Sequence, residues 1–182
     1  MTKKKVYVPL AIDFLHEGHI RLLKIANSYG DVIVGLMTDS AISQYKTIPN
    51  LDYKNREMLV KSVKTVFKVV PENDVDYRKN LQSLKPDYLV HSNDWLFDHR
   101  ISIRKKVIKN LKKINAKLIE PKYYKLSDKN FQKDKISNFS GRTVHRVAKL
   151  KRLINSKKIV RILESHNSLV GLIIENLKVI KK

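Results

Sequence analysis

Two histidines that stand three positions apart are the residues of this chain best suited to phosphate chemistry. His16 and His19 flank Glu17 and Gly18, between an apolar segment expected to be a strand and a stretch expected to be a helix. Glycine lets the backbone approach a ligand closely, and the amides and dipole of a helix N-terminus attract phosphate. The pattern favours a phosphate-binding turn that carries two imidazole donors. The alternative is a pair of structural or metal-binding histidines.

The elements that must position this turn alternate between strands and helices. Apolar runs with β-branched residues predict buried parallel strands over 6–12, 31–37, 66–70, 87–91 and 117–119. Apolar spacing predicts helices over 19–29, 55–63, 77–84, 98–114 and 141–154, with Gly30 as the first C-cap and Thr38-Asp39-Ser40 as a helix start. This order predicts an α/β fold, a Rossmann-like doubly wound parallel sheet with a C-terminal helical extension. In such sheets ligands bind at the carboxyl ends of the strands, where the histidine turn lies.

The alternation fades after the fifth predicted strand. Residues 123–135 form a polar, lysine-rich stretch, and 159–180 contain a markedly apolar segment that does not follow the preceding rhythm. We therefore expect a nucleotide-binding domain over 1–150 and a C-terminal extension over 151–182.

Length and composition exclude several classes of protein. The 182 residues suffice for one well-buried domain, and the absence of cysteine excludes disulfides, a thiolate nucleophile and cysteine-based zinc sites. The start of the chain lacks an apolar signal core and no apolar run reaches membrane-spanning length, so we expect a cytoplasmic protein with no membrane partner. The net charge of +21 attracts polyanions, although compositional bias with lysines solvated on helix faces would also produce it.

The segment from Ala11 to His19 resembles the signature of the HxGH nucleotidyltransferase superfamily, which includes the glycerol-3-phosphate, phosphocholine and phosphoethanolamine cytidylyltransferases. The match comprises a strand before the turn, an Asp three residues ahead of the first His, and a helix after the turn. The resemblance implies catalytic roles for His16, His19 and Lys46. It also implies nucleotide contacts from Ala11, Ile12, Asp13, Phe14 and Gly18.

A second segment, Lys85 to Trp95 (KPDYLVHSNDW), is similar to the KPDyvvhGDDW block of the cytidylyltransferase branch. The resemblance implies that His91, Asp94 and Trp95 contribute to nucleotide binding, with Asp94 and Trp95 on the base and ribose side of a CTP pocket. Without the family, Trp95 would be read as a core or interface residue.

Weaker matches complete the resemblance. Arg56 begins a helix as in the family's Arg-containing R-x-x-x-L pattern and is assigned to acceptor binding, although a surface cation is the plainer interpretation. Ile136, Ser137 and Ser140 stand where the family carries an ISST or ISTT signature that holds phosphates. The sequence departs from the family pattern at Pro9, at Ser92 and at Asn138-Phe139.

The C-terminal stretch from Arg161 to Asn176 resembles the opening of phosphoenolpyruvate phosphomutase, which some proteins of phosphonate biosynthesis carry fused behind a cytidylyltransferase. The barrel strands that perform mutase catalysis are absent, so no mutase activity is expected. The alternative is an amphipathic element that packs on the domain or on a second subunit, which leaves a homodimer open.

Together these resemblances imply an enzyme that transfers CMP from CTP to a small phosphonate or phosphate acceptor, such as 2-hydroxyethylphosphonate or 2-aminoethylphosphonate. Mg²⁺ is the expected cofactor, held by the nucleotide phosphates. An adenylyltransferase that uses ATP on a phosphorylated cofactor precursor is the second interpretation. A non-catalytic, basic nucleic-acid-binding module is the third, and nucleic acid is the less favoured partner because no aromatic ladder or single basic block is present.

Overall fold

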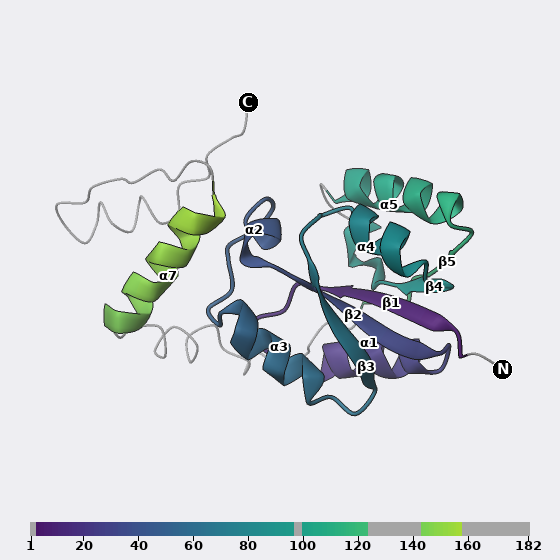
Figure 1. Cartoon of the computed structure of the whole chain (residues 1–182), viewed down its shortest axis with the longest axis horizontal. Coiled ribbons are helices and arrows are strands. Elements are labelled where there is room, and N and C mark those ends of the chain that lie inside the picture. The colour runs from purple at the N-terminus through teal and green to yellow at the C-terminus, as the bar shows by residue number, and fades with distance from the viewer. Residues whose placement is uncertain (1–2, 97–99, 124–142, 158–182) are drawn as a thin grey trace.

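The fold is a five-stranded parallel sheet between two layers of helices (Figure 1). The computed structural model describes residues 3–96, 100–123 and 143–157. The strands are β1 (Lys5–Leu10), β2 (Asp31–Met37), β3 (Val66–Glu72), β4 (Tyr88–Val90) and β5 (Lys117–Ile119), in the order β3-β2-β1-β4-β5. The order reverses beside β1, and this switch point is where open α/β sheets bind ligands. The predicted fold class is confirmed.

The helices lie on both faces of the sheet. They are α1 (Glu17–Asn27), α2 (Asp39–Ile42), α3 (Tyr53–Lys61), α4 (Arg78–Leu84), α5 (Ile101–Lys113) and α7 (Thr143–Ser156), with a short 3-10 helix η1 at Asn93–Leu96. α1 and α3 cover one face, and α4 and α5 cover the other (Figure 1). α7 contacts α2 at the end of the sheet where β1 finishes.

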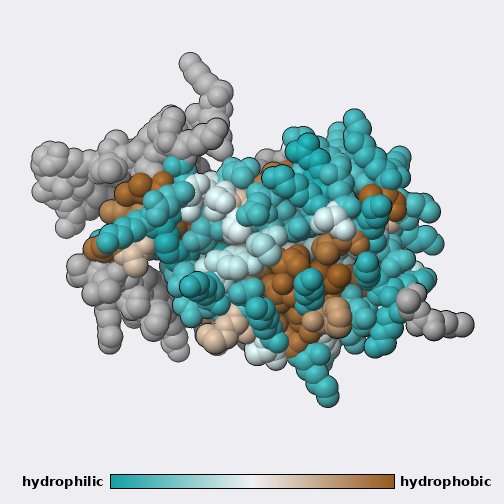
Figure 2. Space-filling view, in the orientation of Figure 1, coloured by the Kyte–Doolittle hydropathy of each residue, from teal (hydrophilic) through white to brown (hydrophobic). Residues whose placement is uncertain are grey.

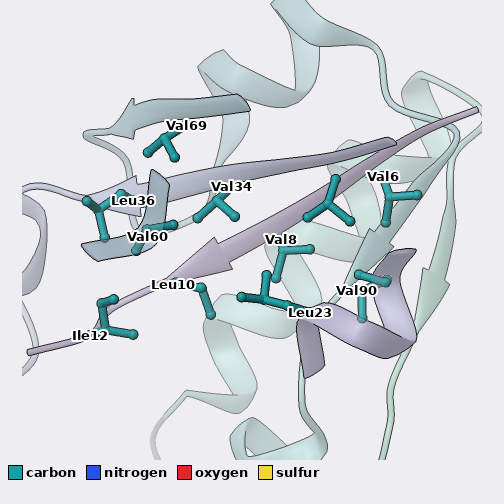
Figure 3. Close-up of a cluster of buried hydrophobic side chains, with 12 residues drawn as sticks. Val6, Val8, Leu10, Ile12, Leu23, Val34, Leu36, Val60, Val69 and Val90 are labelled. Carbon is teal, nitrogen blue, oxygen red and sulfur yellow. The ribbon is translucent and has the colours of Figure 1, made fainter. Parts of the chain in front are cut away.

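The period-two alternation of β1 divides the core between the two layers. Val6, Val8 and Leu10 pack with Leu23 of α1 and Val60 of α3 in the cluster drawn in Figure 3. Tyr7 points to the other face and joins the cluster beneath α4 and α5. Its hydroxyl lies where a side chain on Gly35 would stand, because a Cβ there would meet Tyr7 Oη at 1.8 Å. Burial on both faces explains why these strands read as continuous apolar runs.

Most element boundaries fall within a few residues of the predicted ones, and two differences have clear causes. The first helix begins at Glu17 because His16 caps it, with Nδ1 accepting a hydrogen bond from the Gly18 amide. The prediction that Gly30 forms the C-cap is wrong, because Ser28 caps α1 in a right-handed conformation. Gly30 instead has φ 153°, and a Cβ on it would meet the Lys4 carbonyl oxygen at 2.0 Å. Gly30 therefore permits close passage of the chain into β2.

The predicted helix over 98–114 corresponds to α5, which spans Ile101–Lys113 and follows η1. The surface in the view of Figure 2 is largely hydrophilic, as the charge of the chain requires, with brown apolar atoms near the middle and at α7. In the part of α7 whose side chains are described, the large exposed apolar side chains are Val147, Leu150 and Ile154. No described helix is both long enough and apolar enough to cross a membrane.

Candidate active site

A cavity of about 740 Å³ opens at the carboxyl ends of the central strands. The turn after β1, the start of α1, the segment after α2 and the segment after β4 all contribute to its wall. Seven of the predicted nucleotide-binding residues and all three predicted catalytic residues line it. These are Ala11, Ile12, Asp13, Phe14, His16, Gly18, His19, Lys46, His91 and Asp94. The structure therefore brings together residues that are up to 83 positions apart in the sequence, from Ala11 to Asp94.

The two imidazoles of the turn are in direct contact. The ring centroids of His16 and His19 are 3.7 Å apart and the rings are tilted by 32°. Because His16 Nδ1 accepts the hydrogen bond of the Gly18 amide at 3.1 Å, the neutral ring carries its proton on Nε2. His16 can then donate that proton in a hydrogen bond to an acceptor in the cavity, such as a phosphate oxygen.

Burial favours the neutral form of both imidazoles. Partial burial lowers the pKa of His16. Burial lowers the pKa of His19 to about 3, with smaller contributions from His16 and from the ammonium of Lys46. His19 Nδ1 is also a buried atom that has no hydrogen-bond partner within the described part of the chain. A buried polar atom without a partner is costly, so this nitrogen lowers stability, while the His19 side chain lines the cavity.

Lys46 brings a positive charge to the same part of the cavity. Its Nζ donates to the carbonyl oxygen of Ala11 at 2.9 Å, which places the ammonium at the end of β1. Partial loss of hydration lowers its pKa, and the nearby guanidinium of Arg100 lowers it further. The two cations together favour a polyanion in the cavity.

Asp13 is held by the loop that precedes α3. Its Oδ2 accepts hydrogen bonds from the backbone amide and side-chain amide of Asn50 at 2.8 and 2.9 Å, and its Oδ1 accepts from the Leu51 amide at 2.9 Å. Three N–H donors thus orient this carboxylate and offset its charge. The Asp of the motif fixes the turn to the neighbouring loop.

The structure corrects the expectation for Arg56. This side chain is fully buried and is absent from the cavity wall. Its Nη1 donates to the Met37 carbonyl at 2.8 Å, and its Nη2 pairs with Asp39 Oδ1 at 2.9 Å. Arg56 cannot contact an acceptor from this position, since its guanidinium ties α3 to the end of β2 and to the start of α2.

The segment after β4 forms a second, tightly paired part of the wall. Asp94 Oδ1 accepts from the Ser92 hydroxyl at 2.6 Å, and its Oδ2 pairs with Arg100 Nη1 at 2.8 Å. His91 Nδ1 lies 2.7 Å from the Ser92 carbonyl oxygen, so this nitrogen donates and Nε2 keeps its lone pair. Burial lowers the pKa of His91, which favours the neutral ring.

Trp95 also differs from its predicted role. The indole is 1% exposed and is not part of the cavity wall. It stacks on His91 with ring centroids 3.7 Å apart and an interplanar angle of 7°, and its Nε1 donates to Glu120 Oε1 at 2.6 Å. Glu120 in turn pairs with Arg104 at 2.7 Å. Trp95 therefore positions His91 and does not contact a base or ribose directly, as the plainer core interpretation of this residue had it.

Sequence reasoning missed several residues of the wall, including Arg100, Tyr45 and Tyr77. Arg100 could have been found, because it follows the second matching segment by five positions and supplies the partner of Asp94. Tyr77 gave no signal. Its backbone is left-handed, with φ 57°, a conformation that a non-glycine residue adopts at some cost and that recurs at functional sites. Ile136, Ser137 and Ser140 lie outside the described residues.

No group of three or more His, Cys, Asp or Glu side chains within 3–96, 100–123 and 143–157 could hold a metal ion. The two carboxylates of the cavity wall, Asp13 and Asp94, already accept hydrogen bonds from several donors.

Comparison with protein families identifies the class that this fold and cavity define. The family model described as cytidylyltransferase-like matches residues 12–162, which is most of the chain. The chain belongs to this family, within the HxGH nucleotidyltransferase superfamily, and the predicted resemblance is confirmed.

Individual relatives agree with the family. The FAD synthase of Aciduliprofundum boonei is 31% identical over 121 residues, which cover 65% of this chain and 78% of the relative. The bifunctional protein HldE of Sulfurimonas denitrificans is 38% identical over 97 residues, or 51% of this chain, and the match spans only 20% of HldE. Among solved structures, the lipopolysaccharide core biosynthesis protein of Thermoplasma volcanium is 27% identical, with a TM-score of 0.58 over 68% of this chain and 99% of that protein.

Proposed function

We propose that this chain transfers CMP from CTP to a small phosphonate or phosphate acceptor and releases pyrophosphate. An acceptor oxygen attacks the α-phosphorus, a new P–O bond forms, and the bond from the α-phosphorus to the bridging oxygen of the β-phosphate breaks. The acceptor oxygen is already anionic at neutral pH, so the enzyme has mainly to position the reactants and to stabilise the charge that develops.

The observation that carries this proposal is the convergence of His16, His19 and Lys46 on one cavity. The Nε2–H of His16 and the ring of His19 supply neutral donors, and Lys46 supplies a cation. Neutral imidazoles can line the cavity without burying unpaired positive charge, and they would donate to the phosphate oxygens of a bound nucleotide. A single preorganised donor of this kind is worth about 3 kcal/mol of barrier, or on the order of a hundredfold in rate.

Two features of the sequence support CTP and a phosphonate as the particular substrates. The segment from Lys85 to Trp95 is similar to the cytidylyltransferase block, and the stretch from Arg161 to Asn176, which lies outside the described residues, resembles the opening of a phosphonate-forming mutase. With Trp95 buried, the support that it gives to CTP rests on sequence similarity and not on a contact in the cavity.

ATP is the second candidate, and the relatives favour it. An FAD synthase, by its name, forms a dinucleotide that contains adenine, and one such relative matches this chain over 78% of its own length. On this reading the acceptor would be a phosphorylated cofactor precursor. His91 Nε2, which keeps its lone pair at the cavity wall, could accept from the exocyclic amine of either cytosine or adenine.

Mg²⁺ enters this proposal with the nucleotide. The described residues offer no three-ligand cluster of their own, and magnesium is commonly held by substrate phosphates together with one or two protein groups. When bound it would neutralise the triphosphate and the departing pyrophosphate.

The test is a panel of CTP, ATP, GTP and UTP, each with Mg²⁺ and with 2-hydroxyethylphosphonate, 2-aminoethylphosphonate or no acceptor, read as pyrophosphate release. We expect acceptor-dependent release with CTP, and about a hundredfold slower release by His16→Ala. Release with ATP alone among the nucleotides would replace the first candidate by the second. Equal rates for the wild type and His16→Ala would contradict both.

A further inference from the structure

A single guanidinium on α7 binds the loop that precedes α3. Arg152 Nε donates to Asp39 Oδ2 at 2.7 Å. Its Nη1 donates to the carbonyl of Asn50 at 2.9 Å, and its Nη2 donates to the carbonyls of Pro49 and Leu51, both at 3.0 Å. Four acceptors from two segments are thus held by one side chain that is 20% exposed.

The opposite edge of the same loop holds Asp13. The Asn50 and Leu51 amides donate to the Asp13 carboxylate, while the carbonyls of these two residues accept from Arg152. Lys149 reinforces the arrangement, because its Nζ donates to Asn50 Oδ1 at 2.6 Å and the Nδ2 of that amide donates to Asp13 at 2.9 Å. α7 and the turn after β1 are therefore connected through residues 49–51, with Arg152 on one side of this loop and Asp13 on the other.

This connection matters because Asp13 lines the cavity that we assign to the nucleotide. A carboxylate that turned towards the triphosphate would repel it. The three N–H donors from Asn50 and Leu51 keep both oxygens of Asp13 directed at the loop. Any change that loosens the loop releases a negative charge beside the phosphates.

We propose that Arg152 is a positioning residue for nucleotide binding, which acts through loop 49–51 to keep the Asp13 carboxylate away from the phosphates of the substrate. The kinetic part of this inference rests on the proposed function. Arginine is needed at this position because its planar fork reaches four acceptors at once, whereas a lysine ammonium is a point charge on a flexible stem.

The kinetic test compares Arg152→Gln with Lys151→Gln. Lys151 is an exposed neighbour on the same helix, so its substitution removes the same charge without touching the loop. Arg152→Gln should raise the KM for the nucleoside triphosphate about tenfold with a smaller change in kcat, and Arg152→Lys should restore little of the loss. Lys151→Gln should behave as the wild type. Equal KM values for Arg152→Gln and Lys151→Gln would overturn the proposal.

A double variant tests whether Arg152 acts through Asp13. Asp13→Asn removes the negative charge that the loop keeps from the phosphates, so adding Arg152→Gln to Asp13→Asn should raise KM much less than tenfold. If the two losses simply multiply, Arg152 acts by another route and the proposal fails.

Amide hydrogen exchange, measured without any substrate, separates this inference from the proposed function. The amides of Asn50 and Leu51 should exchange faster in Arg152→Gln than in Lys151→Gln, at temperatures where both proteins remain folded. Unchanged exchange would overturn the connection even if the enzyme is active. If the amides exchange faster in Arg152→Gln but the wild type releases no pyrophosphate, the connection through the loop is supported and the proposed function fails.

Discussion

The turn after β1 and the segment after β4 line the same cavity, but the buried nitrogen of His19 and the carboxylate of Asp94 differ in how they are paired. After β1, His19 Nδ1 is buried without a partner in the described structure, and the pKa values of His16 and His19 are lowered mainly by burial. After β4, Asp94 is paired with Ser92 and Arg100. The comparison indicates that the two regions have different roles. The turn after β1 serves ligand binding at some cost in stability, and the segment after β4 stabilises the cavity wall.

The scaffold should respond most strongly to loss of the indole. Trp95→Ala leaves a cavity under His91 and removes the donor to Glu120, so the free energy of unfolding should fall by about 3–5 kcal/mol. Chemical denaturation measures it. Trp95→Phe, which can still stack on His91, should lose clearly less stability and should keep a kcat close to that of the wild type. A large loss of kcat in the Phe variant would mean that Trp95 takes part in the chemistry after all.

The turn should show the reverse behaviour. His19→Ala removes one donor from the reacting phosphate and should lower kcat by about a hundredfold, equivalent to roughly 3 kcal/mol of barrier. The free energy of unfolding should change far less than in Trp95→Ala, because the substitution also removes an unpaired buried nitrogen. Pyrophosphate release and chemical denaturation, measured on the same preparation, check the expected changes in kcat and in unfolding free energy. A variant that loses stability and keeps its rate would reverse the comparison.

The ion pair behind the indole should have a smaller effect. Arg104→Gln removes the two hydrogen bonds to Glu120 at 2.7 and 2.8 Å from a pair that is partly exposed, with side chains 27% and 20% accessible. We expect a loss of about 1–2 kcal/mol in unfolding free energy, between the values for exposed and buried pairs. Lys105→Gln, an exposed neighbour on α5, serves as the control and should change stability by less than about 0.5 kcal/mol.

The free energy of unfolding should change gradually with pH because of His19. The pKa of His19 is about 3 in the folded protein and about 6.5 in the unfolded chain, so the unfolded state binds more protons between these values. Stability should therefore fall as pH is lowered through this window, by up to about 1.4 kcal/mol per pH unit for this one group. The difference in unfolding free energy between the wild type and His19→Gln, measured at pH 7 and at pH 5, separates the contribution of His19 from those of the other titrating groups. Parallel pH profiles for the two proteins would show that His19 is not a buried neutral imidazole.

The fold could be predicted because its signals are local and repeated. Apolar runs marked the strands, and the Asp, His and Gly of the first turn marked the carboxyl end of β1. Gly30 could not be placed correctly, because its role depends on the approach of the carbonyl of Lys4, which precedes β1 and is distant in the sequence. The helix predicted over 98–114 agrees with α5 to within three residues at each end, because its apolar spacing is also a local signal.

The site could be predicted only where a residue's role follows from its own segment. His16, His19 and Asp94 satisfied this condition and line the cavity. Arg56 and Trp95 did not, since their burial is decided by Asp39 and Glu120, partners 17 and 25 positions away. Arg152 gave no sequence signal for the same reason, because its acceptors lie more than 100 positions earlier in the chain.

The most direct test of this account is an NMR titration of the histidine side chains with a non-hydrolysable CTP analogue and Mg²⁺, with signals assigned by single His→Gln variants. Contact with the phosphates should shift the ring signals of His16 and His19 and raise both pKa values, because a nearby anion favours the protonated imidazole. Saturable binding that leaves these two rings unchanged, and moves only His91 or none of the three, would contradict the assignment of the turn after β1 to the reacting phosphate.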